Sequence, residues 1–410
     1  MKNYRILVTN LLLLISSMVS AQEELNKYLQ TAAENNPGLK AKFSEYMAAL
    51  ETAPQVKALP DPQVAFAYFI LPVETRVGPQ QFKFSASQLF PWFGTLKAKE
   101  NVAIEMAKVK FEQFQQAKSK LFNEVSANFY SIYFNTQAIE ISKENIEILH
   151  SFQKLANIKV EAGKVSAVDA YRIEMEIGDL ENQLALLNDN QKTLAVMFNN
   201  LLNVDRNEPV IVPAELWESD FPLAKENVLD SIRMNNHQLL GLSLQQEALE
   251  YRKEVAENMG KPDFRIGFDY TIVGKGENNM AGTDAFVFPT VGITIPLYRN
   301  KYKAMVNEVM HLQTANELMQ TDQENVLESI FEKTWKEYND ASRRIQLYAN
   351  QLGLAKQAIH LLETEYSTGN SKFEEVLRME RRVLKYNLEF EKAKADKQAA
   401  ISFIHFLMGQ

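Results

Sequence analysis

Two kinds of hydrophobic pattern alternate along the chain. In residues 94 to about 159, which contain neither Pro nor a further Gly, apolar residues recur mainly at steps of three, four and seven. This stripe consists of Phe114, Leu121, Val125, Phe129, Ile132, Ile139 and Ile146. Such spacing is typical of a long helix that packs in coiled-coil fashion. About 65 residues at ~1.5 Å each predict a rod of roughly 100 Å. A second rod is predicted over residues 300–365, interrupted only by Gly353.

Each predicted rod ends at a glycine, and a second helix begins directly after it. Gly163 and Gly369 suit the C-terminal cap of a helix. Ser166 with Asp169, and Ser371 with Glu374, have the spacing of an N-terminal capping box. The pattern therefore predicts two long antiparallel helical hairpins. Two further helices are expected at about 23–57 and 224–260.

Four shorter segments alternate apolar and polar residues, which predicts strands at about 63–71, 81–90, 263–274 and 285–296. In the third of them, Phe264, Ile266 and Phe268 alternate with Arg265 and Gly267. Strands with one apolar and one polar face suit a transmembrane β-barrel, although half-buried hairpins of a soluble domain would alternate in the same way. Four strands are too few to close a barrel across a membrane, and open edges in lipid leave backbone groups unpaired. A barrel would have to be shared between two or three copies.

The chain also repeats itself. Pro60-Asp61 and the strand pattern after it recur at Pro262-Asp263, 202 residues later (262 − 60 = 202). A repeat of this length is too long for a solenoid unit and indicates duplication of half a protein. We therefore expect a mixed α and β fold in which residues 22–410 form one unit of two structural repeats, 22–221 and 222–410.

The N-terminus has the character of an export signal. Residues 1–21 comprise a basic start, an apolar run from Ile6 to Ile15 and small residues up to Ala21, which is typical of a cleaved signal peptide. The alternative, a membrane anchor, would need a longer apolar run. The sequence contains no cysteine, so neither a disulfide nor a lipid-bearing cysteine is expected.

Charge and motifs argue against several classes of function. The formal net charge is −8, and no basic stripe suggests a nucleic-acid partner. The five histidines are scattered without the spacing of metal ligands, so no metal site is predicted. There is no phosphate-binding glycine loop and no nucleophile elbow. We therefore predict no catalytic residue and no cofactor, and that the protein is not an enzyme.

The order of these elements resembles the TolC family of outer-membrane efflux factors. Residues 87–94 (SQLFPWFG) resemble the family's strand-to-helix junction, with residues 295–298 (IPLY) as the second copy, and residues 35–39 (NNPGL) resemble its early Asn-Pro motif. The resemblance implies a homotrimer with a 12-stranded barrel in outer-membrane lipid and a helical tunnel extending into the periplasm. It implies a passive exit duct for efflux or type I-like secretion. The duct would dock on a periplasmic adaptor and an inner-membrane pump of RND or ABC type. The alternative function is a soluble periplasmic adaptor or scaffold, which would share the helical hairpins.

The resemblance also directs attention to the two hairpin tips. Asp169 in the first tip, with Tyr366, Glu374 and Glu375 in the second, match positions that narrow the tunnel in the family, so we treat them as gate candidates. Tyr366 is a candidate hydrogen-bond partner of Asp169. Threefold rings of carboxylates would make a cation-selective mouth. The carboxylates also suit the first turn of a helix, where they meet the helix dipole favourably, and both explanations stay open.

The tip turns themselves are candidates for adaptor docking. They comprise Gly163 and Lys164 in the first hairpin and Gly369 and Asn370 in the second. The family's further acidic position, one turn beyond the second tip, is occupied here by Arg378. A second acidic ring is therefore not expected.

Overall fold

The computed structural model describes residues 22–163, 165–217, 220–276, 282–368 and 373–410. The predicted signal peptide, Lys164, Gly369 and Asn370 lie outside the described residues. The chain divides into two compact units. The hairpin unit comprises Met1–Ala41, Gln115–Asn236 and Asn325–Gln410, and the sheet unit comprises Lys42–Phe114 and His237–Glu324.

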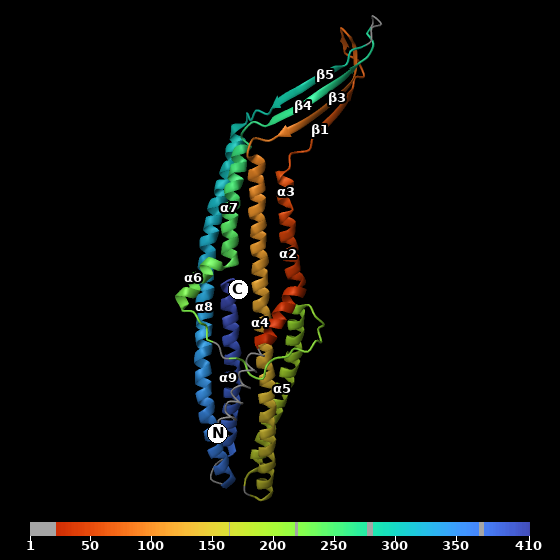
Figure 1. Cartoon of the computed structure of the whole chain (residues 1–410). Coiled ribbons are helices and arrows are strands. Elements are labelled where there is room, and N and C mark those ends of the chain that lie inside the picture. Colours follow the sequence, from red (N-terminus) through yellow and green to blue (C-terminus); the bar gives the residue numbers. More distant parts are fainter. Residues whose placement is uncertain (1–21, 164, 218–219, 277–281, 369–372) are drawn as a thin grey trace, which may run out of the picture. The chain divides into compact units, whose positions relative to one another are not determined.

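Most described residues are helical (Figure 1). A helical segment at 22–35 is followed by α2 (Pro37–Leu50), α3 (Thr52–Lys57), α4 (Thr95–Glu161), α5 (Ala167–Leu202), α6 (Lys225–Asn235), α7 (His237–Asn258), α8 (Arg299–Thr368) and α9 (Phe373–Leu407). The long α4 and α8 are the two predicted rods. The second rod runs through Gly353, because α8 continues without a break at this glycine. Glycine keeps its backbone hydrogen-bonding groups, so it weakens a helix without breaking it.

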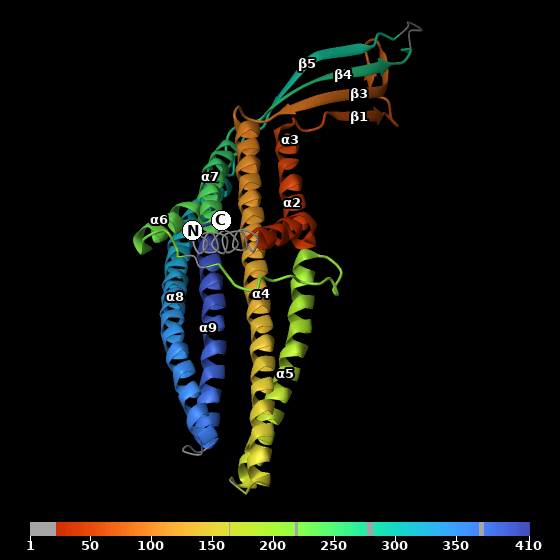
Figure 2. The same cartoon turned by 60° about the horizontal axis from the view of Figure 1, so that its bottom comes forward.

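In the hairpin unit, α5 returns along α4 and α9 returns along α8 (Figure 2). Apolar side chains from all four helices meet in one cluster, which includes Leu149 of α4, Ile173 of α5, Ile359 of α8 and Val376 of α9. The apolar stripe predicted on α4 is part of the buried core. Phe129 and Ile132, for example, have no exposed surface.

Two asparagines break the helices that precede the strands. The single helices expected at 23–57 and 224–260 were therefore wrong. The Asn36 side chain accepts a hydrogen bond from Leu39 N at 3.0 Å and donates one to Leu201 O at 2.9 Å. Asn236 likewise donates to Leu407 O at 2.9 Å. An asparagine side chain can serve both purposes because it carries a donor and an acceptor. Each asparagine thus satisfies a carbonyl at the end of a return helix.

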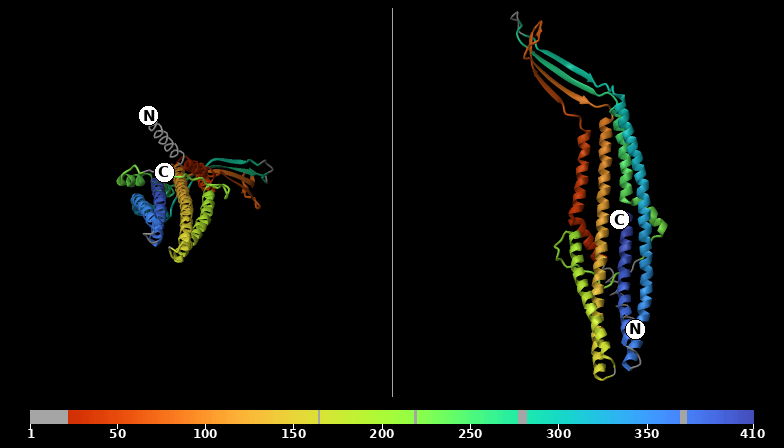
Figure 3. Two further views of the ribbon diagram at one scale, coloured as in Figure 1. Left: turned by 90° about the horizontal axis from the view of Figure 1, so that it is seen from below. Right: turned by 180° about the vertical axis from the view of Figure 1, so that it is seen from behind.

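The sheet unit contains five antiparallel strands, β1 (Gln63–Tyr68), β2 (Glu74–Thr75), β3 (Gly78–Phe90), β4 (Phe264–Val273) and β5 (Ala285–Ile293). The order is β1-β3-β4-β5, and the short β2, which the sequence pattern did not predict, pairs with β3. Figure 3 shows the four main strands side by side. The two strand hairpins therefore meet where β3 pairs with β4.

The sheet has one apolar and one polar face, as the alternation predicts. Phe84 lies opposite Phe66 on one side and Tyr270 on the other, which continues the apolar face across three strands. On the polar face, Ser85 lies opposite Asp269 and donates a hydrogen bond to it at 2.5 Å. Much of the apolar face is uncovered in the single chain. Its most exposed strand residues are Val64 (74%) and Val291 (71%), which lie on the two edge strands.

Candidate gate at the helical tips

The first tip is a tight turn built around Gly163. This glycine has φ +66°, in the left-handed region that glycine adopts at little cost. Ser166 then caps α5, because its side chain accepts a hydrogen bond from Val168 N at 3.2 Å. The predicted capping box is incomplete, since Asp169 N donates to the backbone oxygen of Ser166 instead of its side chain. Asp169 nevertheless occupies the first turn of α5, as expected.

The second tip presents two neighbouring carboxylates. Glu374 and Glu375 lie in the first turn of α9, and both are exposed. The turn before them lies outside the described residues.

Arginines connect the candidate carboxylates across the two hairpins. One guanidinium nitrogen of Arg172 lies 3.7 Å from an oxygen of Asp169 in its own helix and 3.6 Å from an oxygen of Glu374 in α9. Arg378 lies 3.6 Å from the other oxygen of Glu374. Arg172 therefore bridges the first and second tips. Glu375 has no ion pair or hydrogen bond with any residue that the structure describes, so its charge stays uncompensated.

Tyr366 does not bond to Asp169, so that prediction was wrong. Its side chain is 2% exposed, and its hydroxyl is buried without a hydrogen-bond partner among the described residues. Its ring packs against Phe373 at a centroid distance of 5.2 Å. Burial, and secondarily the charge of Asp169, raise the pKa of the Tyr366 hydroxyl. Tyr366 is a packing residue of the tip, in electrostatic contact with Asp169.

Two further cations connect the hairpins. The Lys159 ammonium of α4 donates to the backbone oxygen of Tyr366 and lies 3.7 Å from the centre of its ring. Such a contact with an aromatic face is attractive. One turn further from the tip, Arg381 of α9 forms an ion pair with Glu176 of α5. Lys159, Arg172 and Arg381 thus tie α4 and α5 to α8 and α9.

Sequence reasoning missed these three cations. The spacing of Arg172 three residues after Asp169 is readable as a local helix pair. Its bond to Glu374 depends on the packing of two hairpins that are some 200 residues apart in sequence (374 − 172 = 202). No local pattern carries that information.

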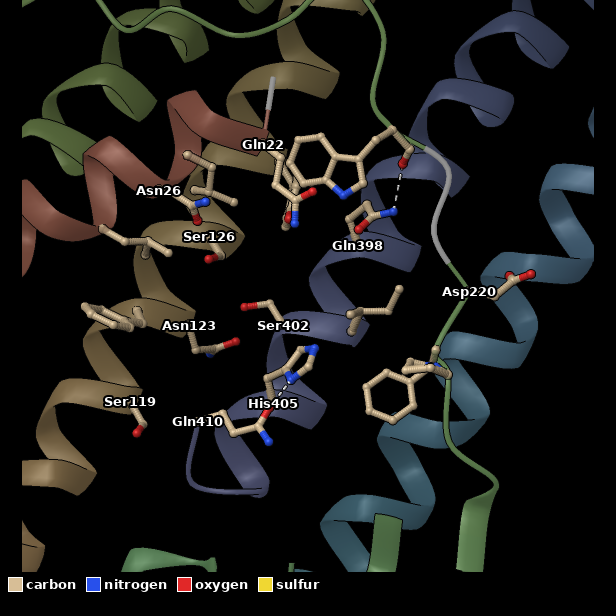
Figure 4. Close-up of a pocket in the computed structure, with 18 residues that line it drawn as sticks. Gln22, Asn26, Ser119, Asn123, Ser126, Asp220, Gln398, Ser402, His405 and Gln410 are labelled. Carbon is tan, nitrogen blue, oxygen red and sulfur yellow. Dashed lines mark hydrogen bonds between the residues drawn. The ribbon is translucent and has the colours of Figure 1, made fainter. Parts of the chain in front are cut away.

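The hairpin unit also holds an open cavity of about 430 Å³, bounded by the helical segment 22–35, α4, α9 and the loop before α6 (Figure 4). Carboxamides and hydroxyls of Asn26, Asn123, Ser126 and Gln398 line it. Gln398 donates to Trp217 O at 3.0 Å, and the carboxylate of Asp220 is paired with Lys397 at 2.6 Å.

Two general features complete the description. None of the described helices combines the length and apolar character that crossing a bilayer requires. Across the described part of the chain, no group of three or more His, Asp or Glu side chains could hold a metal ion.

A comparison with protein families finds a match in the first half of the chain. The model described as "Outer membrane efflux protein" matches residues 28–204. This segment covers the first Asn-Pro motif, the first strand hairpin, α4, the Gly163 tip and α5. The resemblance seen in the sequence is thereby confirmed for this part of the chain.

Solved structures extend the likeness to nearly the whole chain. The outer membrane protein VceC from Vibrio cholerae aligns with a TM-score of 0.78 at 13% identity, over 95% of this chain and 97% of VceC. The CmeC outer membrane channel of Campylobacter jejuni aligns with a TM-score of 0.74 at 14% identity, over 94% and 86%. The open-state MtrE channel of Neisseria gonorrhoeae gives 0.74 at 14% identity, over 94% and 89%. Among curated proteins there is no significant match. The chain thus has the fold of an outer membrane efflux channel.

Proposed function

We propose that three copies of this chain form a passive duct, with a shared 12-stranded barrel and a helical tunnel that extends into the periplasm. The observation that carries the proposal is the strand order β1-β3-β4-β5. Among the described residues, the edge strands β1 and β5 are each paired on one side only, and much of the apolar face is uncovered. Unpaired strand edges are not tolerated in lipid. Three copies supply twelve strands, within the size range of outer-membrane barrels.

The proposal includes the route and the partners of the duct. A signal peptide at residues 1–21 would export the chain, and the repeats 22–221 and 222–410 would each supply one strand hairpin and one helical hairpin to the wall. The tips would dock on a periplasmic adaptor, which binds an inner-membrane pump of RND or ABC type. The match to the family model and the shared fold support this role. The alternative of a soluble periplasmic adaptor leaves the exposed apolar strand face unexplained.

Localisation provides the first test. The expressed protein should appear in the outer-membrane fraction. It should migrate on a gel as a trimer when unheated and as a monomer after boiling. Recovery of the chain as a soluble periplasmic monomer would contradict the proposal.

We also propose that the tips form the gate of this duct. Arg172 and Lys159 hold the two hairpins together, so the closed tip depends on contacts within the chain. Exposed ion pairs contribute about 0.2–1 kcal/mol each. Beside the apolar cluster shared by the four helices, the gate is therefore held by several weak polar contacts, which a docked adaptor could replace one by one. Glu375, with its unpaired carboxylate, would supply the charge that selects cations.

Substitutions at the neighbouring residues Glu374 and Glu375 test the two roles separately, namely holding the hairpins together and selecting cations. Glu374→Gln removes the acceptor of Arg172, so we expect more frequent opening and higher mean conductance in planar bilayers. A loss of about 1 kcal/mol changes an equilibrium roughly fivefold. Glu375→Gln should lower cation selectivity and leave the mean conductance nearly unchanged. If both variants matched the parent in conductance and selectivity, the tip would not be the gate.

A further inference from the structure

We infer that β5 of one copy pairs with β1 of a second copy in a defined register, with Thr290 opposite the partner's Ala67. The inference rests on the proposed trimeric barrel and specifies how its seams are formed. It follows from the geometry of the two strand hairpins within one chain.

The two hairpins have the same register. β1 pairs with β3 through Gln63↔Ser87 and Ala65↔Ser85. Adding 202 to the β1 numbers and 205 to the β3 numbers gives Arg265↔Gly292 and Gly267↔Thr290. Both of these pairs occur between β4 and β5. The same offsets therefore relate the first hairpin to the second as far as Gly267↔Thr290. The register of the second hairpin shifts by one residue beyond this pair, where Asp269 lies opposite Val287.

Applying these offsets to the residue pairs between β3 and β4 gives the pairs expected at the seam, where β5 of one copy meets β1 of the next. The pair Ser85↔Asp269 becomes Thr290 opposite the partner's Ala67 (85 + 205 = 290; 269 − 202 = 67). In the same way, Ala86↔Phe268 becomes Val291 opposite the partner's Phe66. Val291 is 71% and Phe66 57% exposed in the single chain. The seam therefore joins the apolar face of one copy to that of the next.

The backbone of β5 is oriented for this pairing. Thr294 N donates a hydrogen bond to Asp263 O, so the backbone groups of Thr294 face β4. Every second residue of a strand faces the same side, so the backbone groups of Gly292 and Thr290 also face β4. Successive residues of a strand direct these groups to opposite sides. The backbone groups of Val291 and Ile293 therefore face the free edge. Pro289, which has no N–H, also lies on the edge side, the position that proline tolerates in a strand.

A second pair of unpartnered groups meets at the same seam. Within the chain, Asp263 accepts a hydrogen bond from Trp92 N at 3.0 Å, where β3 leads into α4. The same offsets match Asp263 with Asp61 and Trp92 with Leu297. Asp61 and the N–H of Leu297 have no hydrogen-bond partner among the described residues. The partner's Asp61 would accept a hydrogen bond from Leu297 N between copies, as Asp263 accepts one from Trp92 N within the chain.

Cysteine cross-linking tests the register, because the natural chain contains no cysteine. Thr290 and the partner's Ala67 would form a non-hydrogen-bonded pair, the closer of the two kinds in antiparallel sheets and within disulfide reach. Thr290→Cys with Ala67→Cys, oxidised with copper phenanthroline in outer membranes, should give linked dimers and trimers on a non-reducing gel. Thr290→Cys with Ala65→Cys should not. Ser85→Cys with Asp269→Cys is the matched internal pair and should link within one chain.

The outcomes separate the register from the trimer. Cross-linking at 67/290 alone supports the inference. A native trimer that links at 65/290, or at neither pair while the internal pair oxidises, overturns the register and leaves the duct standing. A monomer that links at neither pair overturns both. Asp61→Ala gives an independent measurement, since it should lower the temperature at which the trimer dissociates on a gel. Asp189→Ala, an exposed site on α5, should not.

Discussion

At the scale of single residues, Glu380 of α9 is the most unusual group. Its side chain is only 4% exposed. Its one hydrogen bond is a long one of 3.4 Å from Asn145 of α4, and no cation among the described residues pairs with it. Ser142, one turn before Asn145, is also buried, and its hydroxyl has no partner among the described residues. Burial, together with the charge of Glu363 of α8, raises the pKa of Glu380 to about 7.

This carboxyl makes stability depend on pH. The folded protein holds the proton up to about pH 7, whereas the unfolded chain releases it near the usual 4.5. Stability contributed by the protonated form is therefore complete below pH 4.5 and is lost as the pH rises through 7. The loss is on the order of 3 kcal/mol. We expect the Tm to fall between pH 5 and 8, and Glu380→Gln to flatten this fall.

The comparison is made by thermal unfolding in detergent at several pH values. Glu140→Gln, at an exposed carboxylate on α4, is the control and should keep the parent's slope. An unchanged slope in Glu380→Gln would show that Glu380 ionises normally.

At the scale of elements, Asn36 and Asn236 mark where the helices that precede the strands are interrupted. Asn36 directly precedes α2 and Asn236 directly precedes α7, and both donate to a carbonyl at the end of a return helix. A helix end leaves its last carbonyls without partners inside the helix. Each asparagine thus supplies a donor to a carbonyl that has no partner within its own helix.

Asn236→Ala should therefore destabilise the fold more than its neighbour. The buried Leu407 carbonyl would lose its donor, at an expected cost of about 1–3 kcal/mol. Asn235 is exposed and bonds only to Ser231 in its own helix, so Asn235→Ala should cost less than about 0.5 kcal/mol. Urea unfolding of the two variants measures the difference. Equal midpoints would mean that the Asn236 hydrogen bond adds no stability.

The sequence was most informative about the elements with regular periods. Alternation located the four main strands, and the glycine at 163 located the first tip. It was least informative where a bond joins distant segments. The break at Asn36 is favoured locally by Pro37, which begins α2, but the carbonyls that Asn36 and Asn236 bind lie 165 and 171 residues away in sequence. The burial of Glu380 depends on α4 and α8. Neither is encoded by neighbouring residues, and β2 is too short to show a period.

At the scale of the whole molecule, the two faces of the sheet have opposite surroundings in the proposed barrel. Phe268 belongs to the apolar face, and Ser87, opposite its neighbour Gly267, belongs to the polar face. A lysine on the lipid face near the middle of the membrane costs about 2–4 kcal/mol, whereas one in the lumen is tolerated. The same substitution should therefore have different effects at the two positions.

Phe268→Lys should reduce the amount of heat-stable trimer in the outer membrane, and Ser87→Lys should leave it close to the parent level. Quantitative blotting of unheated and boiled membrane samples compares them. If Ser87→Lys were the more harmful substitution, the assignment of lipid and lumen faces would be reversed.

The common register of the two strand hairpins has a consequence for divergence. In a ring of six identical halves, every substitution would appear six times. In the proposed trimer, each chain contains two halves, so a substitution in one half appears three times. The other half of each chain can differ at the same place. The two strand hairpins share their register as far as Gly267↔Thr290, whereas the tips differ, with Arg172 on the first and Arg378 on the second. In the proposed trimer, the periplasmic end of the tunnel would therefore alternate between two different helical tips.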